Sequence, residues 1–318
     1  MISSGLLVCS FYLKKKFSRG NDNVIDLNRK INDEENNSEY ADIFELFNYF
    51  LNDASKTKDN ERSMKLFSVL PETIKNYDSE TYRATSFAVN SGSYGLESEI
   101  TDRISGKIKY KRTRNDADIK QFYCLIYVPK DADGTSIQKG IMLFQTLSTY
   151  GIKTITTQEM KEFFSKKGIT LETRSVSVRM FMEKIIESGS LTKVTLVKNS
   201  VSPDSSDNMF ISTGREEKSY IKPKLKQNWI DKFLDFLDGK NQDDIFEIND
   251  EIFHDIRITF SISGKSRTVR ANDIDRFSVV EEIPDSIFNN GKYSKEELIN
   301  HMLTVAETYK SKMVFRIE

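Results

Sequence analysis

The chain of 318 residues is poor in the residues that most often carry enzyme chemistry or cross-link small folds. It contains only two cysteines and two histidines. Cys9 and Cys124 lie far apart in apolar surroundings, so we expect reduced core residues of a cytosolic protein. The motifs of zinc sites, phosphate loops, dinucleotide-binding loops and nucleophile elbows are missing. The sequence therefore predicts no metal site and no cofactor, and it indicates no small-molecule substrate.

Long apolar runs are also missing. The opening segment, Met1 to Leu13, contains the apolar run Leu6-Leu7-Val8 and holds about eight apolar residues, whereas a helix that spans a bilayer needs roughly 20. Three lysines at 14–16 follow this stretch instead of preceding it, which is the wrong order for a signal peptide. We therefore expect a first β-strand here, in a cytoplasmic protein.

The charges are almost balanced. The 47 basic and 48 acidic residues give a net charge of -1, so the chain as a whole has no attraction for nucleic acid. A site for a polyanion must therefore be a local patch. The mean hydropathy of -0.51, with 21 phenylalanines and 13 tyrosines, predicts a folded protein with a polar surface over an aromatic-rich core.

Helical and strand periodicities occur in turn along the chain and predict an α+β fold, with mixed or antiparallel sheets and flanking helices. Helices are expected at about residues 39–55 and 295–312, and around Met160, Ile185 and Phe233. Strands are expected at residues 64–70, 82–89, 107–112, 122–128, 141–147, 169–176 and 191–197, with a hairpin that pairs 255–263 with 267–271.

Residues 200–207, rich in serine, aspartate and proline, are the best candidate for a domain boundary. We expect an N-terminal α+β domain at 1–200 and a C-terminal domain at 201–318 that carries a basic segment, the hairpin and the last helix. That helix has apolar residues at near-heptad spacing, which favours an intramolecular core and leaves a dimer contact as the alternative. These residues are Leu298, Met302, Val305 and Tyr309.

The strongest positive signal is the basic segment Ile221–Lys226. Pro223 removes a backbone donor and disfavours a helical conformation at Lys222, so we expect an extended chain. Lys222, Lys224 and Lys226 would then project from one side, as point charges that suit a phosphate backbone. From these residues alone, a solvated extended segment is the alternative.

A second basic set falls in the strand expected at 107–112. It consists of Lys107, Lys109, Lys111 and Arg112. In a strand the three lysines share one face, about 6.6–6.8 Å apart, while Ile108 and Tyr110 turn to the core. The pattern is at least as typical of an edge strand kept soluble by lysines as of a phosphate-binding surface.

One group of carboxylates keeps an enzyme among the candidates. Glu97, Glu99 and Asp102, beside Lys107 and Lys109, could supply the ligands of a metal-dependent nuclease. Among 48 acidic residues, however, a chance grouping of this kind is expected. A solvated acidic edge is the favoured interpretation, and the nuclease is kept as an alternative.

The segment Ile221 to Phe233, with the sequence IKPKLKQNWIDKF, resembles the RexA-like family of phage exclusion proteins, which place a similar Lys-Pro-Lys stretch ahead of a helix. The order of elements over roughly residues 120–315 is also similar. An apolar strand at 141–144 is followed by a helix that ends in Lys167-Gly168, a further strand, and a glutamate-rich terminal helix that begins near Glu296. The N-terminal half is longer than in that family and includes the first expected helix.

This resemblance implies a two-lobed fold related to RdgC and a homodimer that binds DNA with little sequence preference. The implied role is bacterial anti-phage defence, or phage exclusion, without catalysis. No recognition helix with base-reading side chains is evident in the sequence, which agrees with binding through phosphates at the two basic sets. The alternatives are the nuclease effector and a protein-interaction module that senses a phage component, with a neighbour-encoded partner that is soluble or membrane-bound.

Overall fold

The computed structural model describes residues 4–16, 23–29, 31–33, 38–40, 42–130, 136–147, 150–176, 182–183, 185–186, 190–198, 216–237, 246–248, 251–253, 255–262, 265–270, 279–289, 292–311, 313 and 315. The chain forms two compact units. Unit 1 comprises Met1–Arg174 and Ile283–Glu318, and unit 2 comprises Ser175–Glu282. Helices combine with mostly antiparallel sheets, so the predicted α+β class is confirmed.

The boundaries between the two units lie after Arg174 and after Glu282, and not at residue 200, where the sequence-based division places the boundary. Strand β13 (Leu191–Lys198) falls in the first domain of the sequence-based division. In the structure it pairs with β14 (Glu216–Ile221) on one side and with β17 (Asp255–Ile262) on the other. It therefore belongs with the residues that follow it. The boundary candidate at 200–207 lies outside the described residues.

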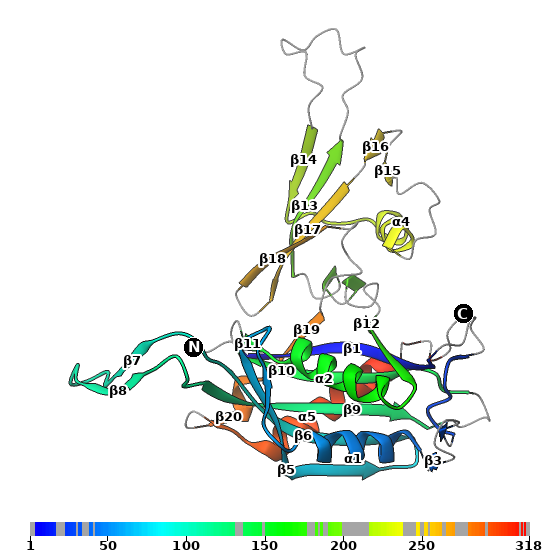
Figure 1. The fold of residues 1–318 in the computed structure, drawn as a ribbon. Coiled ribbons are helices and arrows are strands. Elements are labelled where there is room, and N and C mark those ends of the chain that lie inside the picture. Colours follow the sequence, from blue (N-terminus) through cyan, green and yellow to red (C-terminus); the bar gives the residue numbers. More distant parts are fainter. Residues whose placement is uncertain are drawn as a thin grey trace. The chain divides into compact units, whose positions relative to one another are not determined.

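Unit 1 is built on a sheet whose main path runs β12-β1-β10-β9-β6-β5-β4 (Figure 1). Strand β10 lies antiparallel to both β1 and β9, and β6 lies antiparallel to both β9 and β5. The short strand β11 extends this sheet beside β10. The strands are β1 (Ser4–Lys15), β4 (Lys58–Asn60), β5 (Lys65–Asp78), β6 (Tyr82–Ser93), β9 (Asp118–Pro129), β10 (Gly140–Leu147), β11 (Tyr150–Gly151) and β12 (Ile169–Ser175).

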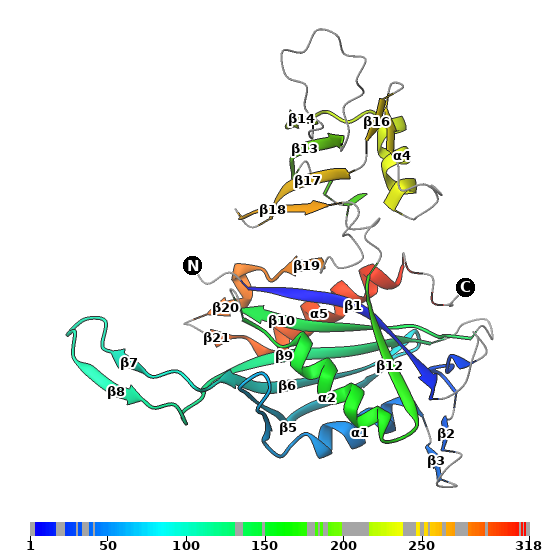
Figure 2. The same ribbon diagram turned by 45° about the horizontal axis from the view of Figure 1, so that its top comes forward.

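Helices cover both faces of this sheet. Helices α1 (Ile43–Asp53) and α2 (Lys153–Ser165) lie on one face, and α5 (Lys295–Lys310) lies on the other (Figures 1 and 2). Because both faces are buried, the central strands carry apolar residues in long runs and not in strict alternation. In β9, for example, every residue from Cys124 to Pro129 is buried.

The start of α1 differs from the prediction of a helix from residue 39. The carboxylate of Asp42 accepts hydrogen bonds from the N–H groups of Phe44 and Glu45, at 2.8 and 3.0 Å, and so caps the helix there. The preceding residues, Ser38–Tyr40, form the short strand β3 instead. Polar capping of the first turn therefore fixes the helix start at Ile43.

Phenylalanines join helices α1 and α2 to the sheet. Phe47 of α1 packs edge-on against Phe11 of β1 and Phe164 of α2, with ring centroids 5.7 and 5.3 Å apart. All three rings are buried. Such edge-to-face pairs contribute beyond the area that they bury, so they fix the positions of both helices. Helix α2 ends, as predicted, just before Gly168, whose φ is +71°.

Helix α5 packs on the opposite face of the sheet. Its apolar stripe is buried within unit 1, which confirms the favoured prediction of an intramolecular core. One polar contact ties the helix to the sheet, because the hydroxyl of the buried Tyr127 in β9 donates to Glu307 Oε1. Lys310 lies 3.5 Å from the other oxygen of the same carboxylate.

Unit 2 contains an antiparallel sheet of strand order β14-β13-β17-β18, with β18 at Lys265–Arg270. The pairing of β17 with β18 confirms the predicted hairpin. Helix α4 (Gln227–Leu237) confirms the helix predicted around Phe233. Residues 182–183 and 185–186 are helical, and the rest of the helix predicted around Ile185 lies outside the described residues.

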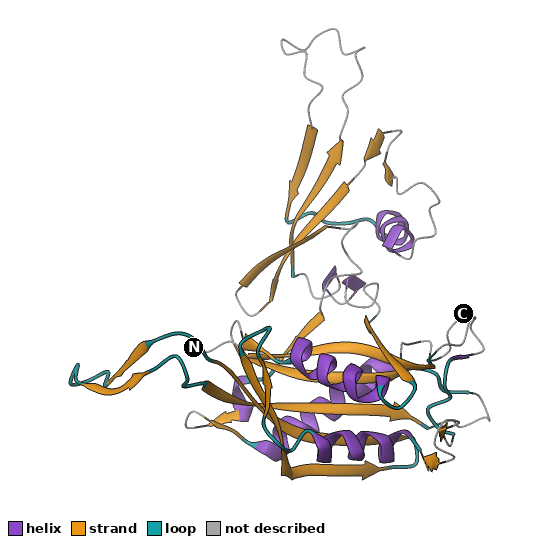
Figure 3. Cartoon of the chain, in the orientation of Figure 1, coloured by secondary structure: helices purple, strands orange, loops and turns teal. Residues whose placement is uncertain are grey.

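Several short strand pairs complete the structure, and one of them forms an arm. Between β6 and β9 the chain continues into β7 and β8, which extend beyond the end of the sheet (Figures 2 and 3). We call residues 94–117 the arm. The short elements are β2 (Ile31–Asp33), β3, β7 (Ser98–Thr101), β8 (Ile108–Arg112), β15 (Phe246–Ile248), β16 (Glu251–Phe253), β19 (Val279–Glu282), η3 (Asp285–Ile287), β20 (Phe288–Asn289) and β21 (Lys292–Tyr293).

The contact between Tyr127 and Glu307 predicts a pH dependence of stability. Burial and the Glu307 carboxylate raise the pKa of Tyr127 well above its ordinary value. In the unfolded chain the phenol ionises above about pH 10, so this group lowers the free energy of unfolding by about 1.4 kcal/mol for each further pH unit. Tyr127→Phe should remove this component, and at pH 7 it should cost about 1.5 kcal/mol through the lost hydrogen bond.

Urea unfolding at pH 7, 9, 10 and 11 measures both effects. Tyr150→Phe is the matched control, because the Tyr150 side chain is 51% exposed. We expect the control to follow the parent protein at each pH. Equal pH dependence in the Tyr127 variant and in the parent would contradict the role given to this contact.

Candidate nucleic-acid interface

The basic segment Ile221–Lys226 lies in unit 2 between the edge strand β14 and helix α4. Strand β14 ends at Ile221, and the chain bends at Lys222, whose φ of +43° is left-handed. The N–H of Lys222 donates to the carbonyl of Thr192 at 2.8 Å, which anchors the bend to β13. The prediction of one extended row of lysines is therefore wrong, because the bend interrupts the row at its first member.

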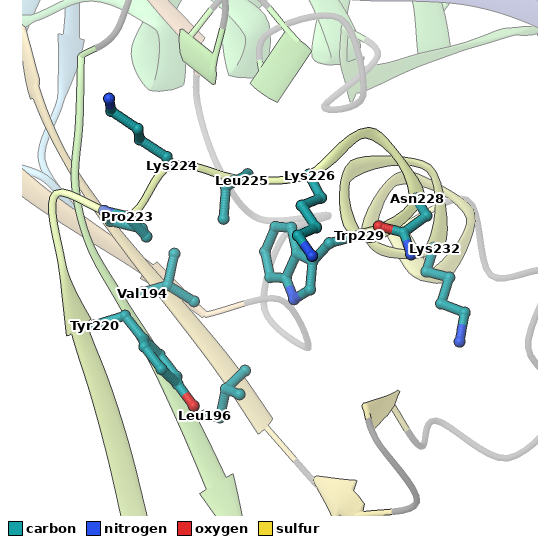
Figure 4. A pocket seen from close by; sticks show the side chains of 10 residues that line it. All are labelled: Val194, Leu196, Tyr220, Pro223, Lys224, Leu225, Lys226, Asn228, Trp229 and Lys232. Carbon is teal, nitrogen blue, oxygen red and sulfur yellow. The ribbon is translucent and has the colours of Figure 1, made fainter.

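A cavity of about 380 Å³ opens beside this segment, between β13, β14 and the start of α4 (Figure 4). Three lysines and two aromatic residues line it, namely Lys224, Lys226, Lys232, Tyr220 and Trp229. The other lining residues are Val194, Leu196, Pro223, Leu225 and Asn228. The cavity thus combines positive charge with flat apolar surface.

The aromatic residues of the cavity are fixed but accessible. Trp229 stacks on Phe233, one turn further along α4, with ring centroids 5.1 Å apart and an angle of 16° between the rings. Phe233 itself is fully buried, whereas Trp229 is half-buried and Tyr220 is 50% exposed. Aromatic faces held in this way are the surfaces on which bases of single-stranded nucleic acid stack.

The start of α4 adds to the positive charge. The carbonyl of Lys226 accepts hydrogen bonds from the N–H groups of Trp229 and Ile230, at 3.0 and 3.1 Å, so Lys226 stands directly at the helix start. The helix dipole places partial positive charge there. In Figure 4, Lys226 lies beside the indole of Trp229 and Lys232 lies further along the helix, while Lys224 points away.

The second predicted basic set lies on the arm of unit 1. Here the prediction that Ile108 and Tyr110 face a core is wrong, because each is 49% exposed. The arm extends beyond the sheet, so its alternating residues have no core to face (Figure 2). Arg112 donates to the backbone carbonyls of Asp116, at 2.9 Å, and Ser93. Lys107 forms no ion pair within the described part of the chain.

Ion pairs neutralise most of the other charges on the arm. They join Lys109 to Asp102 at 2.6 Å, Lys111 to Glu99 at 3.3 Å and Arg114 to Glu97 at 3.3 Å. The Lys109 ammonium and nearby backbone N–H groups lower the pKa of Asp102 to about 2. The three carboxylates considered as nuclease ligands are thus partners of arm cations. Across the described ranges, no group of three or more Asp, Glu, His or Cys side chains could hold a metal ion.

The structure brings together part of the predicted site and adds to it. Lys224 and Lys226 share one cavity, and the set around Lys109 belongs to the other unit. Sequence reasoning missed Tyr220 and Lys232, and it assigned Trp229 to the apolar stripe of the helix. The presence of aromatic residues on both sides of the lysine segment could have identified Tyr220 and Trp229, whereas the sequence carries no comparable signal for Lys232.

Comparisons with known proteins identify no relative: no family model matches the chain, and neither a curated protein nor a solved structure matches it significantly. No helix in the described part of the chain is long and apolar enough to cross a membrane.

The single tryptophan gives a direct test of the positive charge at the cavity. Iodide, an anion, should quench the fluorescence of Trp229 more efficiently than the cation caesium, because the three lysines raise the local anion concentration. Replacing Lys224, Lys226 and Lys232 by glutamine should reduce iodide quenching about twofold while leaving acrylamide quenching, which senses access alone, unchanged. Iodide quenching that is equal in both proteins would show that the lysines create no local potential at Trp229.

Proposed function

We propose that the protein binds DNA through its phosphates, without sequence preference and without catalysis of its own, in bacterial anti-phage defence. The single observation that supports this proposal most is the cavity beside α4, which joins three lysines to two accessible aromatic faces. Lysines are point charges for phosphates, and aromatic faces accept any base. The same combination explains why no base-reading element is required.

The cavity favours a particular form of DNA. A base stacks on Tyr220 or Trp229 only if it has left its own stack, so the site suits a single strand or a locally opened duplex. Phosphates of the same strand then lie near Lys226 and Lys232, and Lys224 adds positive charge at the edge of the cavity. Lys222, at the bend, and the arm lysines are further candidates for phosphate contacts.

The defence role has a separate support. It depends on the resemblance of the segment Ile221–Phe233 to the RexA-like proteins and on the similar order of elements. The two-lobed RexA/RdgC-like architecture, the homodimer and a neighbour-encoded partner are part of this proposal and stand or fall with it. They are independent of the cavity chemistry and require their own measurements, and the mass of the protein in solution tests the homodimer.

Binding measured against salt concentration tests the DNA proposal. The fluorescence anisotropy of labelled oligonucleotides of about 20 nucleotides, single-stranded and duplex, should give affinities that fall steeply between 50 and 200 mM salt. Two unrelated sequences should bind alike. Replacing Lys224, Lys226 and Lys232 by glutamate should weaken single-strand binding at least tenfold and lower the salt slope by about 2, because about 0.7 is lost for each phosphate contact.

A control with the same change in total charge separates the site from a general effect. Lys56, Lys75 and Lys161 are exposed lysines of unit 1, so replacing them by glutamate should leave affinity within about threefold. No binding at 50 mM salt, or equal losses in both variants, would overturn the proposal. Cleavage of the oligonucleotide that requires Mg²⁺ and vanishes in Glu97→Gln or Glu99→Gln would indicate the nuclease instead. Capture of a neighbour-encoded protein without nucleic acid would indicate the interaction module.

A further inference from the structure

The arm is a two-stranded ribbon that continues the centre of the sheet of unit 1. Strands β6 and β9 pair along their whole length, up to Ser93 opposite Asp118, and the arm begins at the next residues. The tip residue Ile104 lies ten positions after Tyr94, a reach of at most about 33 Å at 3.3 Å per residue. This is close to one turn of duplex DNA, which is roughly 34 Å.

The two faces of the arm differ in character. Ile100 and Tyr110 are cross-strand partners and therefore share one face, which is apolar. Glu99 and Lys111 are the next pair, so they share the other face, where their ion pair links the strands. The apolar face is not covered, since Ile100 is 55% and Tyr110 is 49% exposed.

The tip of the arm is held in one shape with an apolar side chain pointing outward. The Asp102 carboxylate accepts hydrogen bonds from the N–H groups of Ile104 and Ser105, at 3.0 and 2.8 Å, and from the Ser105 hydroxyl at 3.0 Å. Gly106 completes the turn with a φ of +70°, a conformation that glycine adopts without strain. Ile104 is 90% exposed, the most exposed of the large apolar residues in the described structure.

Charge complementarity indicates what this tip would contact. The arm carries six basic and four acidic residues, a net charge of +2 in a chain whose net charge is -1. Three of the four acidic residues are Glu97, Glu99 and Asp102, which pair with arm cations. The cations next to the tip, Arg103 and Lys107, form no ion pair within the described residues. A partner with anionic edges around an apolar interior matches this arrangement, and duplex DNA, in which two phosphate backbones flank stacked bases, has that chemistry.

We propose that the arm lies along the minor groove of duplex DNA, with Ile104 inserted between two base pairs as an apolar wedge. Arg103 and Lys107 then lie at the phosphates on either side. Apolar wedges of this kind unstack one base step and kink the duplex by about 20–90°. This inference depends on the proposed DNA binding and adds a second contact, made by the arm with duplex DNA, to the contact proposed at the cavity.

The kink gives a readout that differs from affinity. A duplex of about 30 base pairs, labelled at both ends for energy transfer and containing a flexible TA step, reports bending directly. The parent protein should shorten the distance between the ends. Ile104→Ala should abolish at least four fifths of this change, with affinity reduced less than tenfold and an unaltered salt slope, because no charge is removed.

Two further variants make the test specific to the tip. Leu96→Ala is the matched control, because Leu96 is 71% exposed at the base of the arm, and it should leave bending unchanged. Replacing Arg103 and Lys107 by alanine should lower the salt slope on duplex DNA by about 1.8, which corresponds to two phosphate contacts. All these side chains are exposed, so the variants should fold as the parent does.

Each outcome decides the proposal. Bending that persists in Ile104→Ala, or salt-dependent binding of the parent protein without any bending, would overturn the wedge while leaving DNA binding intact. A change of mass in solution from dimer to monomer in Ile104→Ala would show that the arm contacts a second copy of the chain. No binding of the parent protein to either form of DNA would overturn both this inference and the proposed function.

Discussion

Twelve consecutive residue pairs join β6 to β9, and the rest of unit 1 is assembled around this ladder. Its strands lie at the centre of the sheet, so α1 and α2 find a surface on one face and α5 finds one on the other (Figure 1). The same ladder supports the arm at its far end. Gly92 is required there, because a Cβ atom at this position would lie 2.0 Å from the carbonyl oxygen of Asp118. Core packing and the projecting ribbon therefore depend on one set of backbone hydrogen bonds.

Much of this fold could be predicted from local patterns. The apolar stripe of α1 and the spacing of Leu298, Met302, Val305 and Tyr309 in α5 identified helices whose buried faces the structure bears out. The arm could not be predicted in the same way. Residues 107–112 alternate between basic and apolar just as a half-buried strand does, and alternation alone does not show whether a second layer covers the apolar side. That information lies in the tertiary structure, where Ile108 and Tyr110 are exposed.

The candidate site shows the same limit. The sequence placed the lysine segment directly ahead of a helix, which the structure confirms, since α4 begins at Gln227. It could not reveal the bend at Lys222, because the bend depends on the carbonyl of Thr192, 30 positions earlier in the chain. The helical periodicity of the sequence is compatible with Trp229 as a core residue and equally with Trp229 in the wall of a cavity. The folded structure distinguishes the two, because there Trp229 is only half-buried and lines the cavity.

Unit 1 is discontinuous in sequence, since Ile283–Glu318 complete a body that Met1–Arg174 begins. During synthesis the sheet residues leave the ribosome first, and α5 emerges only after the whole of unit 2. Until then the sheet face that carries Tyr127 lacks the helix that covers it. Unit 2, whose strands are close in sequence, is free to fold meanwhile as a unit of its own. Because of the order of translation, the packing of α5 onto the sheet is the step that completes unit 1. Premature termination would leave an apolar sheet face exposed and prone to aggregation.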